Sequence, residues 1–451
     1  MDMAHAGDLR FTTSVQTTNG FSMQFSNTVA GQAYTLQSRD RLTNGIWLTL
    51  DSPQPWPTVQ TQWNDTISST QALRLYRAVG VQPATRGKLL SFSLVTNFST
   101  LTLDFAYLLY GINLSAQYGV SCYKVVYETI DPLGGRVTAS GGLYLPQKTG
   151  KSWPLLSFSH STETQTNEAP SITLTLDAFA GVAFASVGYA SVVADLLGMG
   201  SSPGFHPFLH ARSEATASVD MLRAARSFCT SNGISLNGQI FVAGYSQGGH
   251  TAMALHRELE RYHTNEFSVT ASAPMAGPYD MSGVELNDIL SGRCVPDPYY
   301  AAYLLVAYQS VYSLAPGWSD LFAPPYDTTI PPLFNGNTTN TVINGALPCN
   351  VTTILRPSLI FALTNDPGCP LYQALRDNDL DRWKPVAPLR LFHCSGDLDV
   401  LPANSQVAYS NFLVRGASQV QLIDPKPGAD HAGCVIPSLV ATKTWFDTLK
   451  Q

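Results

Sequence analysis

The pattern G-x-S-x-G, centred on Ser246, follows the apolar run 240–243 and precedes an expected helix. So sharp a strand-to-helix turn brings the flanking positions close to neighbouring backbone, which explains why Gly244 and Gly248 carry no side chains. The turn raises the Ser246 hydroxyl above the edge of a sheet. It also leaves the Gln247 N–H at a helix N-terminus, where it can stabilise an oxyanion. The pattern predicts a nucleophilic serine.

A nucleophilic serine needs a histidine to take its proton, and the histidine needs a carboxylate to fix its tautomer. His431 lies in a polar loop after an expected strand and before the last expected helix, whereas the other eight histidines lie elsewhere in the order. Asp397 lies in the loop after the apolar segment 389–392. Asp399, two residues later, would serve instead if that loop were shifted.

The order serine, acid, histidine resembles that of the α/β-hydrolase superfamily. The stretch "LRLFHCSGDLDV" is similar to its pattern H-G-x-x-D-x-x-V, with Cys394 in the glycine position and Asp397 as the acid. The stretch "LLSFSHSTET" resembles the loop that supplies the second oxyanion donor, with Ser161 where glycine is usual. The resemblance implies Thr162 as that donor, with His160 as the alternative.

From about residue 88 to the end, stretches such as "VVADLLGMGSSPGFHPFLHARSEATASVDMLRAAR" and "APMAGPYDMS" resemble secreted bacterial and fungal esterases and lipases, the secretory lipases among them. The resemblance implies ester hydrolysis under a helical cap, with no metal and no organic cofactor. It does not identify the acyl or alcohol group of the substrate.

Two domains are expected. Residues 9–82 alternate apolar and polar residues between NG and AG turns, which predicts a small β-sandwich that resembles fibronectin type III modules. Residues 88–451 alternate short apolar strands with helical segments, which predicts the mostly parallel, doubly wound sheet of an α/β-hydrolase. Within this domain, residues 122–146 are expected to form antiparallel strands. The stretch of about 281–386 is too long for a crossover connection and predicts the inserted helical cap.

The chain has seven cysteines and no Cys/His cluster of zinc spacing. Cys394 lies three residues before Asp397, and Cys434 lies three residues after His431. If the acid and the histidine meet in a triad, the two cysteines come within disulfide distance, so we expect a bond between them. A second pair, with Cys349 and Cys369 as one candidate, would pin the cap.

The formal net charge is −6 and charged residues make up 13% of the chain, which argues against nucleic acid as a partner. The longest apolar stretch, 178–198, is rich in small residues and is expected to be a helix and a buried strand rather than a membrane span. The composition suits an exported protein, secreted or periplasmic, although the first residues lack the features of a signal peptide.

The leading hypothesis is an esterase that acts on a small-molecule or polymeric ester. A peptidase with the same triad and a catalytically silent binding protein are the alternatives.

Overall fold

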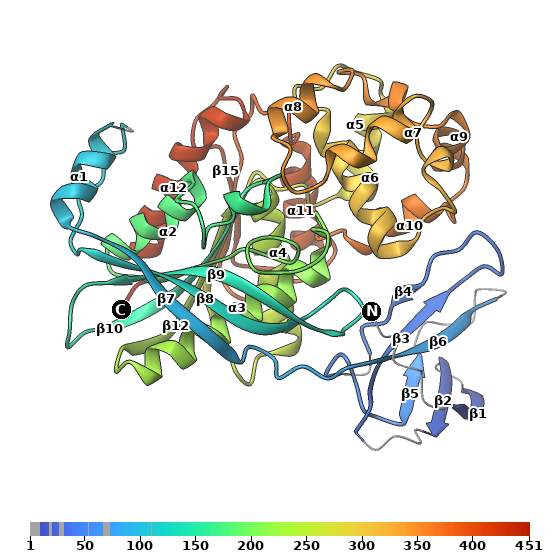
Figure 1. The fold of residues 1–451 in the computed structure, drawn as a ribbon, viewed down its shortest axis with the longest axis horizontal. Helices are drawn as coiled ribbons and strands as arrows, with labels where there is room; N and C mark the ends of the chain where they lie inside the picture. The colour runs from blue at the N-terminus through green and yellow to red at the C-terminus, as the bar shows by residue number, and fades with distance from the viewer. Residues whose placement is uncertain (1–9, 18–19, 27–30, 53, 66–72, 110) are drawn as a thin grey trace.

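The computed structural model describes residues 10–17, 20–26, 31–52, 54–65, 73–109 and 111–451. Parts of the predicted 9–82 module, such as residue 9 and residues 66–72, lie outside the described residues. The described chain contains one large sheet flanked by helices, a long helical insertion, and two small sheets near the N-terminus (Figure 1).

The large sheet has nine strands in the order β15-β14-β13-β12-β10-β11-β9-β8-β7. The six strands from β15 to β11 run parallel, and β9, β8 and β7 continue the sheet antiparallel. This confirms the mostly parallel α/β-hydrolase sheet and the antiparallel pairing within 122–146. In chain order the strands are β7 (Leu89–Phe98), β8 (Val120–Ile130), β9 (Arg136–Pro146), β10 (Ser152–Ser159), β11 (Ala190–Ala194), β12 (Ser235–Tyr245), β13 (Val269–Met275), β14 (Leu389–Phe392) and β15 (Val420–Ile423).

Helices cover both faces of this sheet, so its central strands are apolar on both sides. Along β12, Phe241 and Ala243 pack on the face covered by α1, α2 and α12, whereas Ile240 and Val242 pack on the face covered by α3 and α4. Helix α11 joins the second face beside β14 and β15. These helices are α1 (Thr100–Leu109), α2 (Leu176–Ser186), α3 (Ala211–Ser231), α4 (Gln247–Tyr262), α11 (Ala403–Val414) and α12 (His431–Asp447), and η1 (Thr166–Glu168) is a short turn.

The helical insertion, residues 276–388, lies between β13 and β14 and contains its own hydrophobic core. Figure 1 shows it in yellow and orange, gathered at one end of the sheet. This is where the sequence predicts the cap. Its segments are η2 (Met281–Glu285), α5 (Leu286–Leu290), α6 (Tyr299–Tyr312), η3 (Trp318–Asp320), α7 (Tyr326–Thr329), η4 (Pro331–Leu333), α8 (Asn340–Gly345), η5 (Val351–Ile354), α9 (Pro357–Asn365) and α10 (Pro370–Asp377).

Near the N-terminus, two three-stranded antiparallel sheets have the orders β1-β2-β5 and β4-β3-β6. Residues of both sheets, Met23 and Trp63 from one and Tyr34 and Leu36 from the other, share one apolar cluster. Ile46 belongs instead to the core of the insertion, so this region packs against the rest of the protein. The strands are β1 (Arg10–Thr17), β2 (Gly20–Ser26), β3 (Ala33–Arg39), β4 (Leu48–Thr49), β5 (Gln62–Asp65) and β6 (Leu75–Val81).

Candidate active site

Ser246 lies in the turn between β12 and α4, with φ 60° and ψ −122°. Residues that carry a side chain rarely adopt this backbone conformation. The close packing around the turn holds Ser246 in it. An added Cβ at Gly244 would lie 2.1 Å from the carbonyl oxygen of Gly248, and one at Gly248 would lie 2.0 Å from that of Ser159. Both glycines are therefore required by close backbone approach, which is the reason the sequence pattern suggests.

The structure brings Ser246, His431 and Asp397 together from three separate segments of the chain. The Ser246 Oγ lies 2.9 Å from Nε2 of His431, and Nδ1 of His431 lies 2.6 Å from Oδ2 of Asp397. His431 is the first residue of α12, and its carbonyl oxygen accepts a 2.6 Å hydrogen bond from the Tyr245 hydroxyl. This arrangement can move a proton from the serine hydroxyl to an imidazole whose tautomer the carboxylate holds.

The carboxylate of Asp397 is held from several sides. Its Oδ1 accepts hydrogen bonds of 3.0 Å from the backbone N–H groups of Asp399 and Val400. Its Oδ2 also lies 3.3 Å from Nε2 of His393, a contact that sequence reasoning missed because His393 stands only four residues before the acid. Burial opposes ionisation of Asp397, but the hydrogen bonds from His393 and His431 outweigh it and hold the pKa well below its usual range. The Asp399 side chain makes no hydrogen bond to His431 within the described residues.

A disulfide joins Cys394 to Cys434, with a Cα–Cα distance of 5.8 Å. It links the loop of Asp397 to the first turn of α12, as the sequence predicts. The suggested pairing of Cys349 with Cys369 is wrong: Cys349 pairs with Cys294, and Cys369 is a buried free thiol. The 276–388 insertion is therefore closed by a bond between its own segments.

The loop after β10 approaches the serine as the sequence predicts. Thr162 lines the pocket beside Ser246 and Gln247. Ser161, in the usual glycine position, donates from its backbone N–H and its hydroxyl to the Asp177 carboxylate, over 3.0 and 3.2 Å. The side chain of Asp177, in the first turn of α2, thus fixes the loop. The His160 ring is hydrogen-bonded to the carbonyl oxygens of Ser161 and Asp195 and does not line the pocket, which favours Thr162 as the predicted second donor.

A buried polar network fixes the residue after the serine. The Gln247 amide nitrogen donates to Glu214 over 3.2 Å and to Nε2 of His206 over 2.8 Å. Glu214 in turn lies 2.6 Å from Nδ1 of His250. The backbone N–H of Gln247 stands at the first position of α4, where an N–H group has no intrahelical carbonyl to bond, so it can donate to an oxyanion. Sequence reasoning missed Glu214, His206 and His250 because nothing in their spacing marks them.

The pocket at Ser246 lies between the sheet and the insertion. Its wall is mostly apolar, but it includes four carboxylates: Glu285, Asp288, Asp297 and Asp399. Of the tyrosines of α6, Tyr300 lines the pocket, while the others, Tyr299, Tyr303, Tyr308 and Tyr312, belong to the insertion core. The pocket wall therefore combines apolar side chains with a group of acidic ones.

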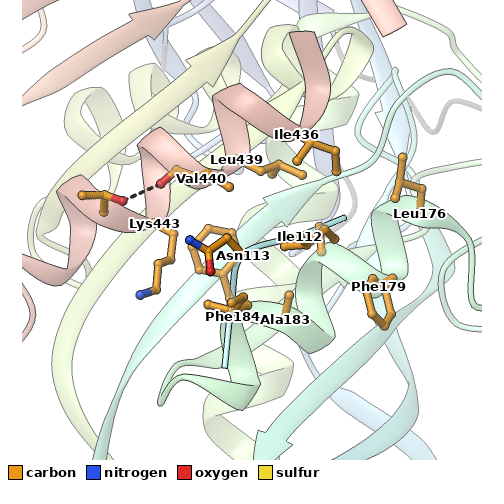
Figure 2. Close-up of a pocket in the computed structure, with 13 residues that line it drawn as sticks. Ile112, Asn113, Leu176, Phe179, Ala183, Phe184, Ile436, Leu439, Val440 and Lys443 are labelled. Carbon is orange, nitrogen blue, oxygen red and sulfur yellow. Dashed lines mark hydrogen bonds between the residues drawn. The ribbon is translucent and has the colours of Figure 1, made fainter. Parts of the chain in front are cut away.

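A second cavity lies between α2 and α12 (Figure 2). Its wall is apolar except at Asn113, Lys443 and Thr444, and it contains none of Ser246, His431 and Asp397. We assign the candidate active site to the first cavity, because that one contains the serine.

Among the described residues, no helix combines the length and apolar character needed to cross a membrane.

The geometry can be compared with known proteins. Residues 136–284 match the X-Pro dipeptidyl-peptidase (S15 family). A comparison with curated protein sequences gives no match. Among solved structures, the rice cell wall degrading esterase LipA from Xanthomonas oryzae is 30% identical, with a TM-score of 0.72, over 81% of this chain and 98% of LipA. The chain belongs to the LipA family of α/β-hydrolases.

Other structures agree with this assignment. A putative hydrolase from Legionella pneumophila is 27% identical to the chain, with a TM-score of 0.73, over 80% of this chain and 98% of its own. Candida antarctica lipase A, at 17% identity and a TM-score of 0.59 over 81% and 84%, shares the fold alone. Like LipA, the chain is an α/β-hydrolase, and the matches indicate a serine hydrolase.

Proposed function

We propose that this member of the LipA family hydrolyses carboxylic esters through an acyl-enzyme intermediate. The observation that carries the proposal is the hydrogen-bonded chain Ser246–His431–Asp397, whose serine lines the pocket. Because LipA is an esterase, we favour an ester over other acyl compounds as the substrate. The complete hydrogen-bonded chain argues against a catalytically silent binding protein.

In the proposed reaction, Ser246 Oγ attacks the ester carbonyl while Nε2 of His431 takes its proton. Asp397 keeps Nδ1 protonated and stabilises the imidazolium. The backbone N–H groups of Gln247 and Thr162 stabilise the tetrahedral oxyanion. His431 then gives the proton to the leaving alcohol. A water molecule, deprotonated by His431, releases the acid and restores the serine.

A peptidase with the same triad remains the second candidate, because two observations favour it. The S15 match covers the segment with the proposed nucleophile, and the carboxylates of the pocket suit the ammonium group of a peptide N-terminus.

We infer further that the N-terminal sheets form a β-sandwich module (residues 9–82) beside the catalytic domain (residues 88–451). Two disulfides suit an exported protein.

The test combines active-site labelling with paired substrates. We expect a fluorophosphonate probe to label the protein and to leave Ser246→Ala unlabelled. We expect p-nitrophenyl butyrate to be hydrolysed with a much higher kcat/KM than an Ala-Pro p-nitroanilide. Faster cleavage of the anilide would favour the peptidase over the esterase. A wild-type protein that the probe leaves unlabelled would support a catalytically silent binding protein. Release of acid from an insoluble plant cell-wall fraction would test a polymeric ester.

A further inference from the structure

Three buried carboxylates meet where the helical insertion joins the sheet. Asp280 precedes η2 at the start of the insertion, and Asp379 and Asp381 lie near its end, before β14. One oxygen of each carboxylate lies within 4.8 Å of those of the other two. Oxygens that ligate one calcium ion at about 2.4 Å are at most about 5 Å apart, so the three carboxylates can share a single ion.

The negative charge of this cluster is poorly balanced. Asp280, Asp379 and Asp381 are only 6%, 7% and 1% exposed. Within the described part of the chain, the ion pairs of the cluster come from Arg382 alone, at 3.5 Å from Asp381 and 3.7 Å from Asp379, and its side chain is 47% exposed. Burying three carboxylates against one half-exposed guanidinium is costly unless a further cation is bound.

Two carboxylate oxygens of the cluster accept no hydrogen bond from the described residues. Asp379 accepts from the backbone N–H and hydroxyl of Ser282, Asp381 accepts at Oδ2 from Asn411, and Asp280 accepts at Oδ2 from a backbone N–H of η2. The Oδ1 atoms of Asp280 and Asp381 are closed to solvent and have no hydrogen-bond partner among the described residues. Buried carboxylate oxygens are normally paired, so these two acceptors point to a missing positive ligand.

We propose that Asp280, Asp379 and Asp381 bind a calcium ion that ties the two ends of the insertion together. Oxygen donors alone select a hard cation. Calcium accepts irregular sets of carboxylate oxygens, whereas magnesium retains several waters, which a site closed to solvent disfavours. The site would hold the insertion, and with it the part of the pocket wall that the insertion supplies, Met281 included, against the sheet. It is independent of the proposed ester hydrolysis.

Calorimetric titration of the full-length protein tests the site directly, after metal has been removed with EGTA. We expect one calcium ion per chain, a higher melting temperature in calcium, and weaker binding of magnesium. Asp381→Asn should abolish the calcium-dependent rise in melting temperature. Asp327→Asn, on α7 of the same insertion but outside the cluster, should keep it. No binding by the wild type, or an equal response of Asp381→Asn, would overturn the proposal, and equal affinity for magnesium would overturn the choice of calcium.

Arg382→Gln gives a second test that does not depend on the folding of Asp381→Asn. Removing the positive charge beside the cluster should tighten calcium binding by roughly tenfold. The variant should melt lower than the wild type in EGTA and regain that loss in calcium. If Arg382 is instead the only counter-ion that the cluster uses, the variant will be destabilised and calcium will restore nothing, which would refute the site.

Discussion

The disulfide between Cys394 and Cys434 should support catalysis as well as stability. It joins the loop of the proposed acid, Asp397, to the helix that begins at His431, whose Nδ1 lies 2.6 Å from that acid. Orientation of an imidazole depends on keeping such a contact short. Removing the bond in Cys394→Ala/Cys434→Ala should therefore lower kcat in a protein that remains folded.

The chain provides a control in its second disulfide, Cys294–Cys349. The two bonds have sequence separations of 40 and 55 residues, for which the loop-entropy relation gives about 4 kcal/mol of unfolding free energy each. The Cys394–Cys434 pair is fully buried, so its removal also leaves unfilled space. Cys294→Ala/Cys349→Ala should lose a similar stability but change KM rather than kcat, because the neighbouring residues Val295 and Val351 line the pocket.

The assay measures kcat and KM for p-nitrophenyl butyrate at a temperature where near-UV circular dichroism shows both double variants folded, with urea unfolding for stability. We expect kcat to fall about tenfold without the Cys394–Cys434 bond and to stay within about twofold without the other. An unchanged kcat in folded Cys394→Ala/Cys434→Ala would refute the reasoning. An equal fall of kcat in both variants would show that general destabilisation, not the link between the two loops, is responsible.

Three further predictions follow from single side chains. Asp397→Asn should lower kcat about 10³-fold or more, whereas Asp399→Asn should have a much smaller effect on kcat. The reason is that only Asp397 is hydrogen-bonded to the proposed base. The opposite ranking in steady-state kinetics would reassign the acid. Burial, with the nearby Asp177 and Glu168, raises the pKa of Glu163 from 4.5 to about 9. The folded state therefore binds more protons than the unfolded chain between these values and loses stability as the pH rises. In urea unfolding, the advantage of Glu163→Gln over the wild type should therefore grow between pH 5 and pH 9. Ile46→Ala should lower the free energy of unfolding by about 2–4 kcal/mol, since Ile46 is 6% exposed in the insertion core. Leu42→Ala, at a position 67% exposed, should leave that free energy nearly unchanged. Equal effects of the two substitutions would argue against the packing of the N-terminal region on the insertion.

The order of local patterns along the chain was enough to predict the sheet and the nucleophile turn. The turn at Ser246 is readable because its glycines are required by contacts within a few residues and one neighbouring strand. The antiparallel strands of 122–146 are readable because period-two alternation reflects local backbone geometry. The Cys394–Cys434 bond followed once two loops were assumed to meet, since each cysteine lies at a fixed short distance from a proposed triad member.

The remaining features depend on which distant segments the fold brings together. His393, Asp177 and Glu214 support the site through contacts that no spacing marks. The pairing of Cys349 with Cys294 depends on the path of the insertion, which its helical periodicity does not specify. The acidic pocket wall and the cluster of Asp280, Asp379 and Asp381 likewise join residues up to about a hundred positions apart. Burial and pairing of charge are properties of packed neighbours in three dimensions, so only the tertiary structure decides them.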